Sequence, residues 1–149
     1  MILPIFTSNY SIKSSILTLD DPSKITEEGS DSILEIAKTN NLKQVVLLES
    51  TFIGFKRAFD SFAAADIQLI FGIRFKICND RLAEDREKTE HKICLFAKND
   101  TGCKELMKLY SAAQTKFNGF LDYSLLKERL TDNLLVVVPI SAVLGLFKG

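Results

Sequence analysis

The residues of this chain that could take part in chemistry are few, and they accompany two apolar runs. Glu49-Ser50-Thr51 follows the apolar run Val45–Leu48, and we expect Arg74, from the second run Ile67–Ile77, to lie at a strand end as well. A carboxylate at the carboxyl end of a strand is placed to act as a metal ligand or a general base, because ligands gather where parallel strands end. The first chemistry to consider is therefore centred on Glu49.

Two arrangements of charge around Glu49 are open. Asp20 and Asp21, if they approach Glu49, would complete a carboxylate set of the kind that holds Mg²⁺. Arg74, if it approaches instead, would disfavour a cation and form an ion pair with Glu49. The ion pair is the simpler interpretation, and its role would be structural.

Other catalytic arrangements lack their components. The chain has one histidine, His91, inside a charged segment, so it can build neither a nucleophilic triad nor a histidine cluster for two metals. It contains no Gly-rich phosphate loop, H-E-x-x-H motif or EF-hand pattern. Arg74 with Lys56 or Arg57 would suit a phosphate, but the sequence leaves their geometry open.

Composition restricts the partners and the compartment. Lysine plus arginine and aspartate plus glutamate number 19 each among 149 residues, so no bulk field draws the chain to nucleic acid or to an anionic membrane. Cys78, Cys94 and Cys103 form no C-x-x-C pair, which indicates reduced thiols. The apolar N-terminus is too short for a signal or membrane segment. We expect a cytoplasmic protein without direct nucleic-acid or membrane contact.

The elements that position Glu49 and Arg74 alternate between strand and helix. Val45–Leu48 is typical of a strand buried on both faces, Gly54–Ala65 of an amphipathic helix, and Ile67–Ile77 of a second strand. A strand, a crossover helix and a strand within about 33 residues form a parallel unit that connects right-handedly. The predicted fold class is therefore α/β.

Further elements flank this unit. The pattern predicts strands at Ile2–Phe6, Ile93–Ala97 and Leu134–Val138, and helices capped by Ser30, Asn99 and Asp122. A charged segment, residues 79–92, is almost entirely charged or polar with both signs mixed, which indicates a solvated hairpin or mobile loop. We expect about five strands and four helices in a single domain, residues 1–149.

Several short stretches carry a family resemblance. The most specific is Ala97–Leu109, A-K-N-D-T-G-C-K-E-L-M-K-L. The others are Thr7–Ser11, Leu48–Gly54, Ile67–Ile77 and Phe120–Ile140. In this order they resemble the polymerase and histidinol phosphatase (PHP) domain, most closely the version at the N-terminus of bacterial DNA polymerase III alpha subunits. The resemblance covers nearly the whole chain.

The resemblance implies a fold and a set of site positions. The fold would be a portion of a distorted β/α barrel of the PHP type, with mostly parallel strands and flanking helices. In the family, His, Asp and Glu side chains at strand ends bind metals for phosphoester hydrolysis or proofreading. The corresponding positions of this chain are Ile5, Thr7, Glu49, Ser50 and Arg74. Only Glu49 keeps a ligand type, so we expect a degenerate metal site with no bound metal, no cofactor and no catalytic residue.

The resemblance also implies a function. We expect a non-catalytic PHP-like domain of a replicative DNA polymerase III alpha subunit, acting as a scaffold and docking surface in DNA replication. Its partners would be other parts of the polymerase or the proofreading exonuclease subunit, and a whole chain containing it would be a DNA-directed DNA polymerase. The length, roughly half that of a usual family domain, favours a fragment over a free-standing protein.

Two alternatives stay open. One is a metal-dependent phosphoesterase or exonuclease whose site is rebuilt around Glu49, Asp20 and Asp21. The other is a small free-standing regulator that binds the replication machinery.

Overall fold

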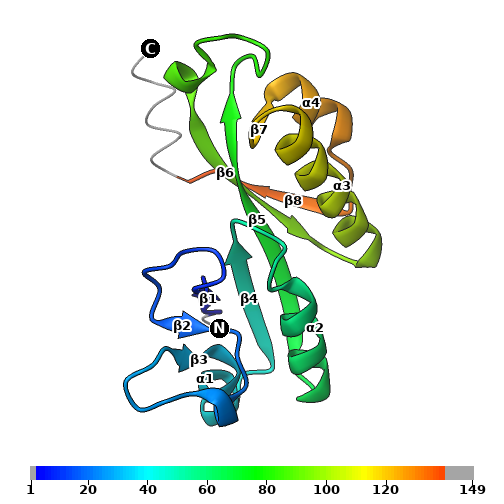
Figure 1. Cartoon of the computed structure of the whole chain (residues 1–149). Coiled ribbons are helices and arrows are strands. Elements are labelled where there is room, and N and C mark those ends of the chain that lie inside the picture. The colour runs from blue at the N-terminus through cyan, green and yellow to red at the C-terminus, as the bar shows by residue number, and fades with distance from the viewer. Residues whose placement is uncertain (1–2, 140–149) are drawn as a thin grey trace. The chain divides into compact units, whose positions relative to one another are not determined.

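The computed structural model describes residues 3–139 and divides into two compact units, Met1–Gly72 and Ile73–Gly149 (Figure 1). The division falls inside strand β5, Gln68–Cys78, which contributes its beginning to the first unit and its end to the second. The predicted fold class is confirmed, because helices alternate with strands whose pairs, in a six-stranded sheet and a separate two-stranded sheet, are mostly parallel. A single domain over residues 1–149 stays a prediction.

The first unit contains strands, two α-helices and a 3₁₀ helix. Its elements are β1 (Ile5–Phe6), β2 (Leu17–Thr18), η1 (Pro22–Lys24), β3 (Asp31–Ser32), α1 (Ile33–Thr39), β4 (Gln44–Glu49), α2 (Phe55–Ala64) and the beginning of β5. Strand β1 pairs with β4 in parallel, with Ile5 opposite Val46, and β2 pairs with β3 in parallel. The core consists of apolar side chains from α1, β4 and α2, which are almost fully buried.

The predicted strand, helix and strand around Glu49 are present as β4, α2 and β5. Strands β4 and β5 are neighbours in the sheet. Their first residues are in contact, since the Gln68 N–H donates to the Lys43 carbonyl (2.9 Å) and the side chains of Gln44 and Gln68 share a hydrogen bond of 2.5 Å. Strands that contact each other at their first residues run in the same direction, so the pairing is parallel as predicted.

The second unit is a sheet covered by two helices. Its elements are the end of β5, the 3₁₀ helix η2 (Arg86–Thr89), β6 (His91–Ala97), α3 (Asp100–Lys116), β7 (Phe120–Asp122), α4 (Tyr123–Arg129) and β8 (Leu134–Val137). Strand β7 pairs with β5 in parallel, and β8 pairs with β6 antiparallel. Strand β6 lies between β5 and β8. Among residues 3–139, no helix has the length and apolar character needed to cross a membrane.

Helix starts follow the predicted caps at two of three positions. The side chain of Asn99 accepts from the Gly102 N–H, and that of Asp122 accepts from the Leu125 N–H, each at 2.8 Å. The cap predicted at Ser30 is wrong. Helix α1 is capped by Ser32, because the two residues before the helix pair with β2 as strand β3 and delay the first helical turn.

Candidate functional site

The carboxylate of Glu49 is held inside the first unit by groups from the loop that follows β1. Glu49 is the last residue of β4, and its side chain is almost fully buried, at 1% exposure. Its Oε1 accepts from the Ser8 N–H at 2.8 Å, and its Oε2 accepts from the Ser8 hydroxyl at 3.0 Å. The Ser11 hydroxyl also donates to Oε2. Because β1 pairs with β4 in parallel, the chain leaves β1 at the edge where Glu49 ends β4.

The neighbouring family positions, Thr7 and Ser50, take part in the same network. The Ser11 hydroxyl accepts from the Ser50 N–H at 2.8 Å, so it both donates and accepts. The Thr7 hydroxyl donates to the Leu48 carbonyl at 2.8 Å, and the Ser15 hydroxyl donates to the Thr7 carbonyl at 2.8 Å. These hydroxyls join the loop after β1 to the end of β4. We call Thr7, Ser8, Ser11, Glu49 and Ser50 the Glu49 cluster.

The other two family positions lie outside this cluster. Ile5 is 61% exposed. Arg74 lies within β5, four residues before the end of that strand, and not at its end as the sequence pattern suggests. Burial raises the pKa of the Cys94 thiol, and the nearby Arg74 guanidinium partly opposes that rise. Glu49 and Arg74 belong to different units, so the ion pair between them stays a prediction.

Asp20 and Asp21 have partners of their own. Asp20 Oδ1 accepts from the Tyr10 hydroxyl at 2.8 Å and pairs with the Arg57 guanidinium. The hydrogen bond from Tyr10 is the main cause that holds the pKa of Asp20 below its usual value, and burial is the main cause that raises the pKa of Tyr10. Asp21 caps η1 by accepting from the Ser23 N–H at 2.9 Å, and contacts with Ser23 lower the pKa of Asp21.

The metal cluster of the family does not fit the residues at its positions. Both carboxylate oxygens of Glu49 accept hydrogen bonds from O–H or N–H donors, and Ile5 and Arg74 offer no ligand atom for a cation. Within residues 3–139, no three His, Cys, Asp or Glu side chains are grouped so that they could hold a metal ion. Asp20 and Asp21 therefore do not assemble with Glu49 into the rebuilt site that the sequence left open.

Lys56 and Arg57, two of the three cations considered for a phosphate site, are engaged by carboxylates. Lys56 pairs with Asp60 at 2.7 Å, one turn along α2. Arg57 pairs with Asp20, and its guanidinium carbon lies 5.6 Å from the centre of the Tyr10 ring. Cations that are neutralised in this way bind a phosphate less strongly.

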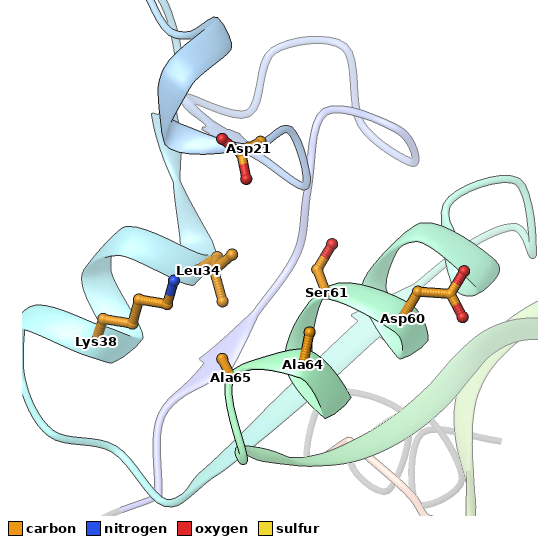
Figure 2. A pocket seen from close by; sticks show the side chains of 7 residues that line it. All are labelled: Asp21, Leu34, Lys38, Asp60, Ser61, Ala64 and Ala65. Atoms are coloured by element: carbon orange, nitrogen blue, oxygen red, sulfur yellow. The ribbon is translucent and has the colours of Figure 1, made fainter.

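A shallow pocket of about 330 Å³ lies between α1 and α2 (Figure 2). Its apolar part is formed by Leu34, Ala64 and Ala65, and charged side chains lie around it: Asp21, Lys38 and Asp60. The close view shows Leu34 and Lys38 on α1 facing Ala64, the last residue of α2, and Ala65, which follows that helix. The pocket is separate from the Glu49 cluster, since the two share no residue.

Asp122 is the second buried carboxylate. The sequence predicted it only as a helix cap and did not predict that it also binds Arg81. Its Oδ1 caps α4, while its Oδ2 accepts from the Arg81 N–H at 3.2 Å and from the Arg81 guanidinium at 2.6 Å. Burial alone would raise the pKa of Asp122, but the hydrogen bonds from Leu125 and Arg81 outweigh it and lower the pKa. The signal available in the sequence was Arg81 in the charged segment, but no local pattern could identify Asp122 as its partner.

The thiols are free, and burial raises the pKa of each. Cys78 and Cys94 are buried in β5 and β6, and Cys103 is half-buried in α3. His91 is half-buried at the first residue of β6.

The fold and the site together define the class. The chain is an α/β protein with mostly parallel strand pairs, in which a polar network gathers at the carboxyl end of β4. The family model of the PHP domain matches residues 9–147, and the chain therefore belongs to the PHP domain family. No curated protein matches the chain in sequence.

Proposed function

We propose that this chain is a non-catalytic PHP domain from a replicative DNA polymerase III alpha subunit, which acts in the cytoplasm as a scaffold and docking surface during DNA replication. Membership of the PHP family supports the general class. The stretch Ala97–Leu109, which forms the end of β6 and the first part of α3, supports the polymerase assignment because it carries the most specific resemblance.

The observation that carries the proposal is the state of Glu49. In a metal site, the lone pairs of a carboxylate point to a cation. Here they accept hydrogen bonds from Ser8 and Ser11, and the neighbouring family positions Thr7 and Ser50 bond to backbone or hydroxyl groups. Hydrogen bonds of this kind satisfy a buried carboxylate without a metal.

The consequence is a change of role for the carboxyl end of β4. Catalytic members of such a family need a metal to generate a hydroxide nucleophile at neutral pH. The Glu49 cluster instead ties the loop after β1 to β4, which stabilises the unit. The strands and helices are kept, and the surface that they support is available for contacts with other subunits.

Metal content and hydrolysis together test the non-catalytic part. The purified chain would be incubated with Mn²⁺ and Zn²⁺, freed of unbound metal, analysed for metal content and assayed on a generic phosphoester. We expect no stoichiometric metal and only background hydrolysis in the wild type, in Glu49→Gln and in the control Glu128→Gln, whose side chain is exposed on α4. Stoichiometric metal that disappears only in Glu49→Gln would contradict the proposal.

Assembly tests the docking part. The chain would be mixed with the remaining part of the polymerase or with the proofreading exonuclease subunit from the same organism, and analysed by size-exclusion chromatography. We expect co-elution with at least one of them. If neither binds, the docking role is wrong, whatever the metal analysis shows.

A further inference from the structure

The charged segment between β5 and β6 separates its charges in space. In the sequence, residues 79–90 mix both signs; we call these residues the arm (Figure 1). In the structure, its two arginines, Arg81 and Arg86, are half-buried, whereas most of its carboxylates are exposed. The arm is therefore a more acidic surface than its composition indicates.

The two arginines of the arm pack against other residues of the second unit. The Arg81 guanidinium binds Asp122 and lies 4.5 Å from the centre of the Phe117 ring. The Arg86 guanidinium lies 5.4 Å from the centre of the Phe120 ring. Both distances are within the range of cation–π attraction. The positive charges of these two side chains are thus directed toward the protein.

Hydrogen bonds join the two ends of the arm and form a turn at its tip. At its base, the Asn79 N–H donates to the Thr89 hydroxyl at 3.1 Å. At its tip, the Leu82 N–H donates to Asp80 Oδ1 at 2.9 Å, and the Ala83 N–H donates to the Asp80 carbonyl at 3.2 Å. An aspartate side chain bonded to the N–H two residues later is a recurrent way to order a turn. These contacts form an anchored turn, which is closer to the solvated hairpin than to the mobile loop among the two expected forms.

The outward side of the arm combines one apolar side chain with several carboxylates. Leu82 is 72% exposed at the tip. The exposed charged residues of the arm are Asp80, Glu84, Asp85, Glu87 and Lys88. Lys88 is the one cation among these five, and it lies 3.6 Å from Asp85.

We propose that the arm is a docking surface for a protein partner that offers apolar side chains bordered by lysine or arginine side chains. Leu82 would pack against the apolar side chains, and Glu84 and Asp85 would meet the basic border. An anchored turn loses little conformational freedom on binding, and apolar anchors surrounded by complementary charge account for much of the affinity in such contacts.

This inference extends the docking role in the proposed function, but it can fail separately. The metal and hydrolysis assays test the Glu49 cluster, which lies in the first unit. Peptide-binding assays test the arm, which lies in the second unit.

Peptide selection tests the inference before any partner is identified. Phage that display short random peptides would be selected on the whole wild-type chain, with phage that bind the Leu82→Ser variant removed first. We expect enriched peptides that combine a large apolar residue with lysine or arginine. Absence of enrichment, or enrichment of acidic or uncharged peptides, would overturn the proposal.

Affinity measurements with an enriched peptide supply the controls. We expect Leu82→Ala to weaken binding at least about tenfold, and Glu84→Gln with Asp85→Asn to reduce the dependence of affinity on salt. Leu130→Ala is the matched control, because Leu130 is also an exposed leucine of the second unit, at 41% exposure. Equal losses in Leu82→Ala and Leu130→Ala would contradict the inference.

Sedimentation of the chain alone tests a different occupant. We expect a monomer whose sedimentation is the same in the wild type and in Leu82→Ala. Concentration-dependent association that Leu82→Ala abolishes would show that a second copy covers the arm, and would overturn the proposal of a basic partner.

Discussion

Among the described residues, two charged side chains are buried, Glu49 and Asp122, and both end a strand. Each is surrounded by donors instead of a single opposite charge. Glu49 accepts from the hydroxyls and a backbone N–H of a serine-rich loop, and Asp122 accepts from two backbone N–H groups and the Arg81 guanidinium. Such donors offset the desolvation of a buried carboxylate, and removal of the carboxylate is destabilising because the donors are then left unsatisfied.

Replacing Glu49 by alanine should lower the stability of the protein, while phosphoester hydrolysis stays at the background level of the wild type. The change removes a buried acceptor of three hydrogen bonds and leaves the Ser8 and Ser11 donors without it, so we expect a loss of about 2–4 kcal/mol in the free energy of unfolding. Urea denaturation measures this loss. Glu128→Ala, at an exposed position, should change the same quantity by less than about 0.5 kcal/mol. A loss in Glu49→Ala no larger than that would show that the cluster is not stabilising.

Asp122 should be more sensitive to truncation than to loss of charge. Asp122→Ala removes both the cap of α4 and the acceptor for Arg81, and we expect a loss of about 2–4 kcal/mol. Asp122→Asn keeps an oxygen for the cap and should lose less. The two variants would be compared by urea denaturation, and equal losses would mean that the cap contributes nothing.

At the scale of elements, the N-terminal turn of α3 passes very close to the segment before β8. A methyl group on Gly102 would overlap the carbonyl oxygen of Asn133. The same contact region includes hydrogen bonds from the Lys98 N–H to the Asn133 carbonyl and between the side chains of Asn99 and Asn133, each at 2.9 Å. Glycine at this position therefore lets α3 approach the chain that leads into β8.

Two effects of opposite sign compete in Gly102→Ala. Alanine favours a helix over glycine by about 1 kcal/mol, but overlap with a backbone atom costs typically about 1–3 kcal/mol. We expect the overlap to dominate, so that the variant unfolds at a lower urea concentration. Lys104→Ala, an exposed change in the same helix, is the control. A Gly102→Ala variant as stable as the wild type would show that the Asn133 segment moves aside at little cost.

At the scale of the whole molecule, the carboxylates make folding sensitive to acid. The pKa of Asp20 and that of Asp122 are lowered in the folded protein, so the unfolded chain binds more protons near pH 4. The stability that these groups contribute is complete above the unfolded pKa of about 3.9 and is lost as the pH falls through the folded values.

The urea midpoint should therefore fall as the pH is lowered below about 4.5. We expect Asp122→Asn to show a shallower fall than the wild type, since it removes one of the groups with a lowered pKa. Denaturation series at pH values from about 7 to about 3 measure the slope. A wild-type midpoint that does not change over this range would contradict the assignment of both shifts.

The sequence by itself predicted the elements with strong local signals. The helix capped at Asn99, the helix capped at Asp122 and the unit β4, α2 and β5 follow from side-chain periodicity and from capping residues, which act within a few residues of the chain. The family resemblance rested on several short stretches taken in order along the chain, and the family model confirms it. The strands β2, β3 and β7 were missed, because two or three residues are too few to show an alternating pattern.

Only the tertiary structure decided what the polar residues do. Glu49 meets Ser8 and Ser11 across 41 and 38 residues of sequence, and Asp122 meets Arg81 across 41. The parallel pairing of β1 with β4 and of β7 with β5 brings these segments together. Hydrogen bonds and ion pairs depend on distance in space, whereas local patterns report only on neighbours along the chain. For that reason the sequence identified Glu49 and the charged segment as polar features. The structure then determined which groups hydrogen-bond to Glu49 and which charged side chains of the segment face solvent.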